Sequence, residues 1–462
     1  MNGELCRPFD NDTFKFRCPA KCLQAGRLLN PYAIGDQIAN YRPLVVGGPA
    51  NSSTSDYGIY RSDSFICPAA IHAGLISNRY GGCGILSLIG ANNNYTSTKR
   101  YEVESIGFDA TFPSSYTFVR DFRSSSCQDL RWHLFAVSIP FTTIISVISS
   151  NAAIPYFSTF VGVFFHVVLA SDVPTSKGKY GLISTALSRF LPAIFIAHFF
   201  WIYVLSGVHS RAPKVERTIL YLGGLWVGAL TNITFDVIIP ISRLTARDLN
   251  QQPGAKTALG IIVVILSFIV IFQVWYLRQS GQLPKMLGLY ATMGTSLGLL
   301  AAIPGTALRI HHYILSMLLL PGTRILTRPS LLYQGILIGL FINGTARWGF
   351  AGIIETYSTL RGDGLYFSDV PTLNTPEVTN ENITIGWNAT AMPDGVSLLV
   401  NDVEMYRGMA EEVGISRVPE EPLYLRVAYL QMTSNGGLNT YDFSHAGVVM
   451  ANGTWVPPPD GY

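Results

Sequence analysis

The feature that most constrains this chain is a stretch of 40 residues, from Trp132 to Ser171, that contains no Asp, Glu, Lys or Arg. A single core helix of a soluble protein rarely tolerates so long an uncharged run, whereas about 20 apolar residues are enough to cross a lipid bilayer once. The run therefore predicts two membrane-spanning helices placed back to back. Only 13% of all residues are charged, against roughly 25% in soluble domains, which agrees with a chain in contact with lipid.

Further apolar runs follow, and we expect residues 132–350 to form a polytopic α-helical transmembrane bundle of seven or eight helices. Pro304, Gly305 and Pro321 interrupt the last three runs, so one of these runs is a candidate re-entrant segment. The expected spans are 133–150, 153–171, 188–208, 218–239, 257–277, 286–303, 306–322 and 330–346.

Three of these spans carry two glycines four residues apart, at Gly224 and Gly228, Gly294 and Gly298, and Gly335 and Gly339. Small residues at this spacing lie on one helix face and let two backbones approach closely in a membrane. The alternative is that glycine is simply tolerated in membrane helices. The pattern favours close helix packing without identifying the partner helices.

Ionisable side chains at membrane depth are costly unless they are paired or functional. One hypothesis places His166, Asp236 and one of His311 and His312 around a metal ion, as in an intramembrane metal-dependent hydrolase; a polar seam between helices would instead make a transporter. Paired helical ligands usually lie at i and i+4, and the sequence contains no His-x3-His. We therefore favour structural pairing, for example of Asp236 with Arg309, and expect no cofactor.

All six cysteines precede the first apolar run, at Cys6, Cys18, Cys22, Cys67, Cys83 and Cys127. An even number of cysteines in one small region indicates disulfides formed in an oxidising compartment. A zinc site at Cys18 and Cys22 is the alternative, but no second close pair or His cluster completes four ligands.

Candidate N-glycosylation triplets agree with this compartment and lie on both sides of the apolar block, at Asn11, Asn51, Asn94, Asn382, Asn388 and Asn452. Acceptors at both ends favour an even number of crossings, hence eight. The chain opens with a polar segment that contains Cys6 rather than with a signal peptide. We expect either that the first helix carries the N-terminal region across the membrane or, as we favour, that the natural chain begins further upstream.

Residues 1–120 alternate short β-rich runs with one helix, expected between Ser64 and Gly74, and form a small α+β domain. Ser62, Asp63 and Ser64 are capping residue types, and Gly74 is a typical helix stop. His72 lies on this apolar helix without a Ser or carboxylate arranged around it by motif, so we expect a packed, hydrogen-bonded histidine.

The segment YGIYRSDSFICPAAIHAGLI, followed by YGGCGIL and preceded by FRCPAKC, resembles the LCCL domain family. This resemblance implies an extracytoplasmic binding module rather than an enzyme, with polysaccharide, lipopolysaccharide or matrix ligands. It also implies the bonds Cys6–Cys18 and Cys22–Cys67, with Cys83 and Cys127 outside the common pattern. The stretches 235–249 and 308–350 resemble multi-pass LCCL-domain proteins of fungi, which bring no established catalytic residues.

Residues 375–462 contain short alternating segments separated by turn signals, which is typical of an all-β sandwich. The segment PLYLRVAYL resembles the F strand of a fibronectin type III-like domain, with Tyr424 as candidate tyrosine corner and Trp387 as core tryptophan.

Together these patterns predict a non-catalytic multi-pass membrane protein of the secretory pathway, in a vacuolar or plasma membrane. It would display its LCCL domain outside the cytoplasm to a glycan, lipid or protein ligand, with the lipid bilayer as its other partner. A net charge of +3 and the lack of a basic stripe argue against nucleic acid. The intramembrane hydrolase or transporter is the alternative.

Overall fold

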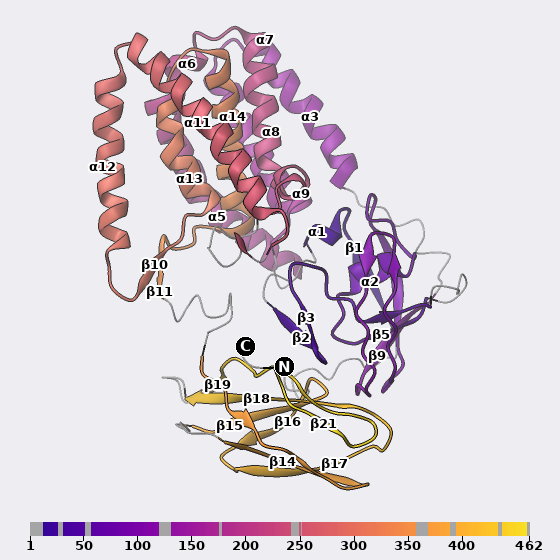
Figure 1. Cartoon of the computed structure of the whole chain (residues 1–462). Helices are drawn as coiled ribbons and strands as arrows, with labels where there is room; N and C mark the ends of the chain where they lie inside the picture. The colour runs from indigo at the N-terminus through magenta and orange to yellow at the C-terminus, as the bar shows by residue number, and fades with distance from the viewer. Residues whose placement is uncertain are drawn as a thin grey trace. The chain divides into compact units, whose positions relative to one another are not determined.

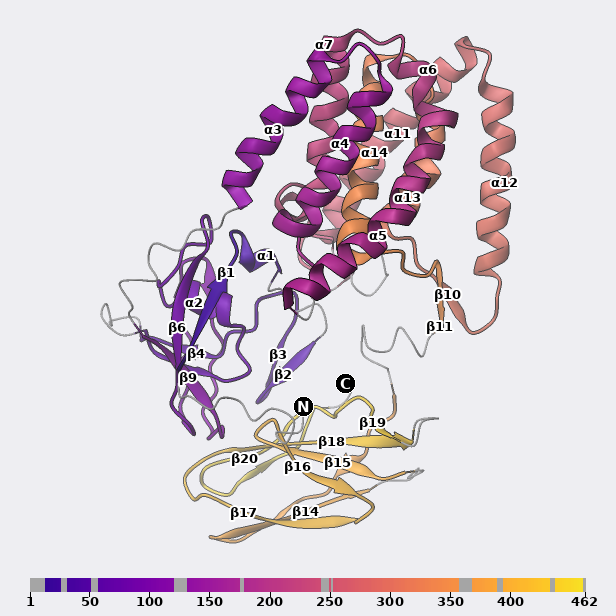
Figure 2. The same cartoon turned by 180° about the vertical axis from the view of Figure 1, so that it is seen from behind.

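The computed structural model describes residues 13–25, 31–50, 57–119, 131–174, 178–241, 249–250, 252–356, 368–388, 394–432 and 437–459. The chain divides into two compact units. One unit is built from both ends of the chain, Met1–Asp129 and Arg361–Tyr462, and the other is the middle of the chain, Leu130–Leu360. Figures 1 and 2 show the β-rich ends and the helical middle from opposite sides.

The N-terminal part is an α+β domain built on one antiparallel sheet. The strand order is β1 (Thr13–Cys18), β6 (Gly82–Leu88), β9 (Ser115–Val119), β5 (Ile59–Arg61) and β4 (Gly47–Gly48). The short helices α1 (Cys22–Ala25) and α2 (Ile66–His72) and the ladders β2–β3 (Tyr32–Ile34, Gln37–Ala39) and β7–β8 (Lys99–Arg100, Val103–Glu104) complete it. Its core places Ala70 and Ile71 of α2 with the sheet residues Leu86 and Phe118.

Helix α2 begins two residues later than the sequence indicates, because the expected capping residues are engaged elsewhere. The Oγ of Ser64 lies 2.9 Å from the Val46 amide and accepts its hydrogen bond. The N-cap is instead Phe65, which makes no side-chain capping bond. The predicted stop is confirmed, since Gly74 follows the helix with φ of +80°.

The C-terminal part is β-rich and has two sheets. In one, β14 (Asn382–Asn388) pairs with β12 (Thr372–Leu373), β13 (Glu377–Val378) and β17 (Glu412–Ser416). The other has the order β16 (Val403–Gly408), β15 (Val396–Val400), β18 (Leu423–Met432), β20 (Gly447–Val449) and β21 (Trp455–Val456), with β19 (Leu438–Thr440) also on β18. Alternate residues of β14, β15 and β18 form a shared core, which includes Trp387 as predicted.

The middle unit is helical, with several long helices that contain π-helical turns. Its elements are α3 (Arg131–Ile148), α4–η2 (Ala153–His166, Val167–Ser171), α5–η3–α6 (Gly178–Phe200, Trp201–Leu205, Ser206–His209), α7–η4–α8 (Lys214–Glu216, Arg217–Leu222, Gly223–Ala229), η5 and α9 (Thr231–Ile233, Phe235–Ile238), α11 (Ala255–Gln279), α12 (Leu283–Ala301), β10 (Thr306–Leu308), α13–η6 (His312–Leu319, Leu320–Thr323), α14–η7 (Arg328–Asn343, Gly344–Trp348) and β11 (Ile354–Thr356).

Within the described residues, four helices are long and apolar enough to cross a membrane: Arg131–Ile148, Ala153–Ser171, Tyr180–His209 and Ala255–Gln279. A fifth is added if the pair Lys214–Ala229 and Thr231–Ile238, bent by 81°, counts as one span. The sequence-based expectation of seven or eight spans thus exceeds the number that this criterion supports.

The predicted span 306–322 is wrong as one continuous helix. Gly305 has φ of +73°, and the next residues form β10, which pairs antiparallel with β11. The helix that follows, α13, has only eight residues. Pro304 and Gly305 therefore end one helix, and the backbone hydrogen bonds of Thr306–Leu308 go to a strand instead.

Two of the three predicted glycine pairs pack against each other. A Cβ on Gly335 would lie 2.1 Å from the Tyr221 carbonyl oxygen of η4, and one on Gly339 would lie 2.3 Å from the Leu225 carbonyl oxygen of α8. Reciprocally, a Cβ on Gly228 would lie 2.2 Å from the Ile336 carbonyl oxygen of α14. The backbones of α8 and α14 thus touch where side chains are missing, as the spacing predicts.

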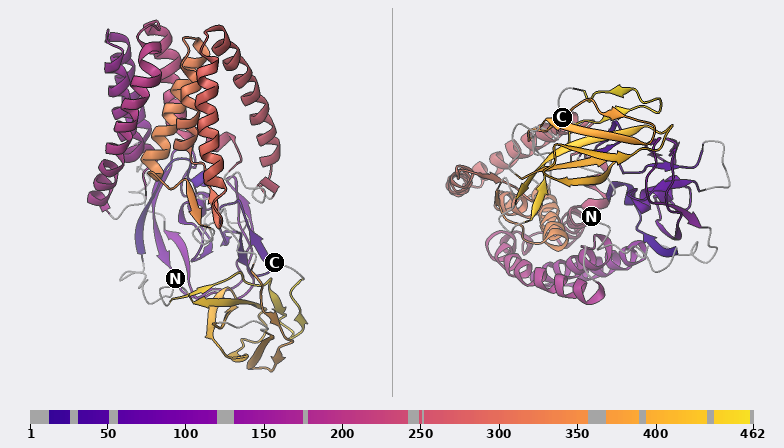
Figure 3. Two further views of the ribbon diagram at one scale, coloured as in Figure 1. Left: turned by 90° about the vertical axis from the view of Figure 1, so that its left-hand side faces the viewer. Right: turned by 90° about the horizontal axis from the view of Figure 1, so that it is seen from below.

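The third pair, Gly294 and Gly298 on α12, has no such neighbour, because an added Cβ would meet nothing within 4 Å at either position. Figure 3 shows α12 standing apart from the other helices of its unit, as do Figures 1 and 2. Its first half is held by Met286 and by Tyr290, whose hydroxyl accepts from the Gly322 amide at 3.0 Å.

Candidate functional site

The best-defined polar centre of the unit built from the chain ends is Arg61 on β5, whose side chain is fully buried. Its guanidinium donates to Asp63 from Nε and Nη2 at 3.0 and 2.8 Å, and to Asp402 from Nη1 at 2.7 Å. It also lies 4.6 and 4.5 Å from the ring centres of Phe108 and Phe112. Burial alone would lower the pKa of Arg61, but the two carboxylates outweigh it and raise the pKa.

Asp402 reaches this centre because of a tight turn in the C-terminal part. Val400 and Val403 pair across the β15–β16 hairpin, and the two residues between them, Asn401 and Asp402, have φ of +50° and +64°. Asn and Asp are among the residues that tolerate this conformation in two-residue hairpin turns. The Asp402 carboxylate also accepts a hydrogen bond from the Gly35 amide at 3.1 Å.

Strand β18 adds a second set of contacts, because its first eight residues are buried on both faces. The side chain of Tyr424 packs on Phe108, with 5.7 Å between ring centres, and its hydroxyl donates to the Asp109 carboxylate. Arg426 donates from Nη2 to the carbonyl oxygen of Gly35. Burial, followed by the Asp109 carboxylate, raises the pKa of Tyr424.

The proposed tyrosine corner is therefore wrong. Tyr424 is not part of the core that the two C-terminal sheets share, and belongs instead to a cluster with Ile34, Leu44, Ile106 and Phe108 of the N-terminal domain. A tyrosine corner bonds backbone of its own domain, whereas the partner of this hydroxyl lies 315 residues earlier in the sequence.

A third carboxylate, that of Glu421, completes the joint between the N-terminal and C-terminal domains. It accepts hydrogen bonds from the Thr111 amide at 3.1 Å and hydroxyl at 2.5 Å, and from Asn93 Nδ2 at 3.2 Å. Partial burial raises the pKa of Glu421, but these hydrogen bonds outweigh it and lower the pKa. The joint can thus hold the two domains as one unit through fixed charges and backbone amides.

His72 is a packed core residue, as predicted. It is fully buried, and its Nδ1 lies 3.0 Å from the Tyr60 hydroxyl, while Nε2 lies 3.1 Å from the Thr98 carbonyl oxygen. A carbonyl only accepts, so Nε2 carries the proton and Nδ1 accepts from Tyr60. Burial lowers the pKa of His72, which keeps the imidazole neutral. A Cβ on Gly48 would lie 2.6 Å from the ring, so the adjacent strand needs glycine there.

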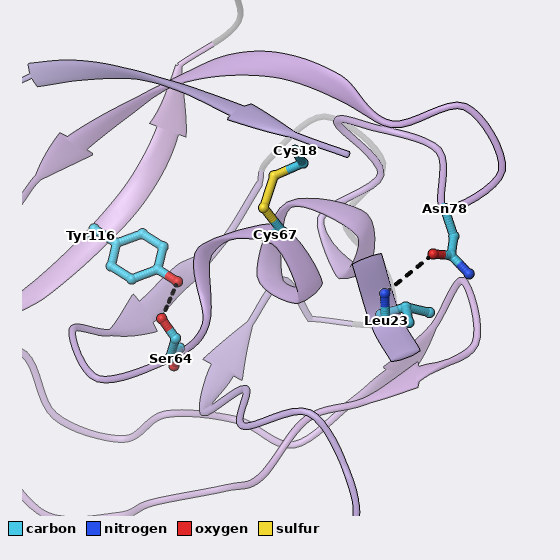
Figure 4. The surroundings of a disulfide bond; sticks show 6 residues. All are labelled: Cys18, Leu23, Ser64, Cys67, Asn78 and Tyr116. Carbon is cyan, nitrogen blue, oxygen red and sulfur yellow. Dashed lines mark hydrogen bonds between the residues drawn. A yellow bond between two sulfur atoms is a disulfide. The ribbon is translucent and has the colours of Figure 1, made fainter. Parts of the chain in front are cut away.

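The disulfide pairing implied by the resemblance is wrong, since the structure joins Cys18 to Cys67 with a Cα–Cα distance of 5.5 Å. Figure 4 shows this bond tying the end of β1 to the second residue of α2, beside the bond from the Tyr116 hydroxyl to the Ser64 carbonyl. Cys22, on neighbouring α1, is buried and is not part of this bond. Cys83 also forms a disulfide, and Cys6 and Cys127 lie outside the described residues.

The predicted glycosylation residues Asn94, Asn382, Asn388 and Asn452 are all exposed in the structure. Asn11 and Asn51 lie outside the described residues.

The four ionisable residues of the metal hypothesis are not gathered. No group of three or more His, Cys, Asp or Glu side chains that could hold a metal occurs in the part of the chain that the structure describes. His166 is hydrogen-bonded to Ser138 at 3.1 Å, and His311 stacks on Tyr313. Arg309 pairs with Glu355 at 2.9 Å, and His312 begins α13.

A buried polar network surrounds His209 and Arg217, two residues that the predicted spans 188–208 and 218–239 leave in the connection between them. His209 Nε2 lies 3.1 Å from Gln334 Oε1, and Gln334 donates to the Thr323 carbonyl at 2.8 Å. Arg217 is only 4% exposed and donates to the carbonyls of His209 and Ser146, both at 3.3 Å. A usable signal was Gln334, a polar amide in the largely apolar run 330–346.

Comparison with known proteins identifies one domain and a relative that aligns with the whole of this chain. The LCCL domain family matches residues 1–115. "Uncharacterized protein YIL067C" of Saccharomyces cerevisiae is 34% identical over 504 residues, an alignment that covers 100% of this chain and 74% of the yeast protein. No solved structure matches.

Proposed function

The chain belongs to the family of the yeast protein YIL067C, and from this premise we propose that it is a non-catalytic, multi-pass membrane protein that displays a ligand-binding LCCL domain. The binding part would lie outside the cytoplasm, on a membrane of the secretory pathway, the vacuole or the cell surface. Its ligand would be a glycan, a lipid or a protein.

The observation that carries the membrane assignment is the exposure of α11. This helix is apolar over 25 residues, and its most apolar window has no buried residue inside the protein. Ile261, Phe268 and Phe272 are 56, 59 and 60% exposed. A contiguous apolar surface of this size is rarely left to water, whereas lipid tails cover it at no cost.

The joint around Arg61 supports an even number of crossings. Residues before and after the helical unit pack together through Arg61, Asp402 and Tyr424, so both chain ends must reach the same side of the membrane. We propose eight crossings, five of which are the four long apolar helices and the bent pair. The N-terminal and C-terminal domains would then act as one binding head.

Glycosylation mapping tests this topology. In the full-length protein, Asn94, Asn382, Asn388 and Asn452 are changed singly to Gln, and the mass sensitive to endoglycosidase is followed. We expect losses for acceptors at both ends of the chain. Glycans only at the N-terminal acceptors would mean an odd number of crossings and would refute a shared binding head.

Binding is tested with the full-length protein in lipid nanodiscs on glycan and lipid arrays. We expect a ligand whose capture is lost when the LCCL domain is blocked by an antibody to residues 57–76. If the protein bound nothing on either array, a glycan or lipid ligand would be refuted. A protein ligand would then be sought by cross-linking on intact cells.

A further inference from the structure

A small cavity lies inside the helical unit where α3, α4, α6 and η4 meet. It has a volume of about 10 Å³, enough for the centre of one water-sized particle. The lining residues with polar side chains are Ser146, Tyr156, Thr159, His209, Arg217 and Tyr221. None of them belongs to the joint around Arg61 or to the metal hypothesis.

Most polar groups around the cavity are already satisfied. Thr159 donates to the Pro155 carbonyl at 2.6 Å, Tyr156 donates to the Ala197 carbonyl at 2.9 Å, and the Ser146 hydroxyl pairs with Thr218 at 2.7 Å. Two buried groups have no hydrogen-bond partner among the described residues: Arg217 Nε and the Tyr221 hydroxyl. Both can donate a hydrogen bond, and Arg217 Nε can do nothing else.

The charge of Arg217 is also uncompensated. Its two terminal nitrogens reach only backbone carbonyls, and no carboxylate lies within 4 Å of it in the described part of the chain. The nearest acid in sequence, Glu216, pairs with Arg328 at 2.8 Å instead. A buried charge without a partner is strongly unfavourable, so it needs a counter-charge or a pKa shift, and arginine does not deprotonate in proteins.

We propose that this cavity binds one small monovalent anion, of the size of chloride, held by the Nε–H of Arg217 and the O–H of Tyr221. An anion accepts both hydrogen bonds and neutralises the guanidinium. A water molecule would also accept them, but it leaves the charge uncompensated and brings two hydrogens of its own that need acceptors. The missing carboxylate therefore favours an anion over water.

The test uses full-length protein in detergent and follows thermal unfolding by tryptophan fluorescence. Sodium chloride replaces sodium gluconate at constant ionic strength, because gluconate is too large for the cavity. We expect the unfolding temperature of the wild type to rise with chloride and saturate, since a ligand that binds only the folded state stabilises it. Bromide is expected to replace chloride and to give anomalous X-ray scattering at the cavity.

Two variants and one control assign the effect to the site. Arg217→Gln is expected to abolish the chloride response, and Tyr221→Phe to raise the chloride concentration at half-effect by about tenfold or more through the loss of one hydrogen bond to a charged group. Arg211→Gln removes the same charge from an exposed residue of the neighbouring connection, and should respond like the wild type.

If Arg217→Gln does not fold, the wild-type titration and Tyr221→Phe still decide the question. A wild-type protein with no saturable chloride response would mean a water-filled cavity and would overturn the proposal. An equal response in wild type and Tyr221→Phe, or the same loss of response in Arg211→Gln, would place the anion elsewhere and overturn it as well.

Discussion

Arg61 and Arg217 are both buried, at 0 and 4% exposure, but the two units of the molecule surround them in opposite ways. Arg61 lies between two carboxylates and over two aromatic rings, whereas Arg217 meets only backbone carbonyls. The unit built from the chain ends thus uses fixed charge pairs to join domains. The helical unit relies on close backbone contact and leaves a cation whose counter-charge the described residues do not supply.

The substitution Arg61→Met tests whether the buried charge pairs of Arg61 stabilise the joint between the domains. It removes the charge and keeps a side chain of similar volume. We expect a loss of about 3–5 kcal/mol in the free energy of unfolding, because Asp63 and Asp402 remain near one another without their partner. Denaturant unfolding of the full-length protein in detergent, followed by near-UV circular dichroism, measures this loss.

Arg407→Met is the matched control, because Arg407 is partly exposed and pairs with Glu404 three residues away. A surface pair of this kind contributes at most about 1 kcal/mol. If Arg61→Met and Arg407→Met reduced the free energy of unfolding equally, the buried ion pairs of Arg61 would contribute no more to stability than a surface pair.

Close backbone contact in the helical unit is tested by Gly335→Ala. The added methyl group would lie 2.1 Å from the Tyr221 carbonyl oxygen, so α14 has to move away from η4 at a cost of about 1–3 kcal/mol. The thermal unfolding temperature of the purified protein reports the loss.

Gly294→Ala makes the same chemical change on α12, where nothing lies within 4 Å. Alanine has the higher helix propensity, so stability should be unchanged or rise by up to about 1 kcal/mol. If Gly335→Ala and Gly294→Ala changed the unfolding temperature by the same amount in the same direction, the result would argue against the α8–α14 contact.

Tyr424→Phe measures the contribution of one hydrogen bond to the joint, because it removes the hydroxyl and leaves the ring on Phe108. We expect a loss of about 1–3 kcal/mol, because the hydroxyl donates to a charged group, the Asp109 carboxylate. A double-mutant cycle with Asp109→Ala measures the coupling between the two residues. A coupling energy near zero between Tyr424 and Asp109 would contradict the hydrogen bond across the joint and would mean that Tyr424 acts only within the C-terminal domain.

The smallest expected effect concerns pH and Glu421. Its pKa is lower in the folded protein than the usual value of 4.5, so its stabilising contribution is fully present above that value and is lost as pH falls through the lowered pKa. The difference in unfolding temperature between wild type and Glu421→Gln should therefore be constant from pH 7 to about 5.5 and shrink below pH 4.5. A difference that grows on acidification would contradict this sign.

Local sequence patterns predicted many elements correctly and some of their details wrongly. The alternation in β14, β15 and β18 and the burial of Trp387 followed from residue types two apart. The Gly335–Gly339 contact followed from a four-residue spacing, although the same spacing on α12 has no partner. The run 306–322 was wrongly predicted as one helix because uncharged runs do not reveal where Gly305 turns the chain into a strand.

By itself, the sequence determined the apolar helices, the α+β and β-rich ends, the LCCL domain and the packed nature of His72, because composition and short-range periodicity encode them. The tertiary structure alone decided the Cys18–Cys67 bond, the cluster to which Tyr424 belongs and the surroundings of the buried arginines. These features depend on contacts between distant segments, such as Arg61 and Asp402, which are 341 residues apart. No local pattern specifies which distant carboxylate, carbonyl or cysteine will be within reach once the chain has folded.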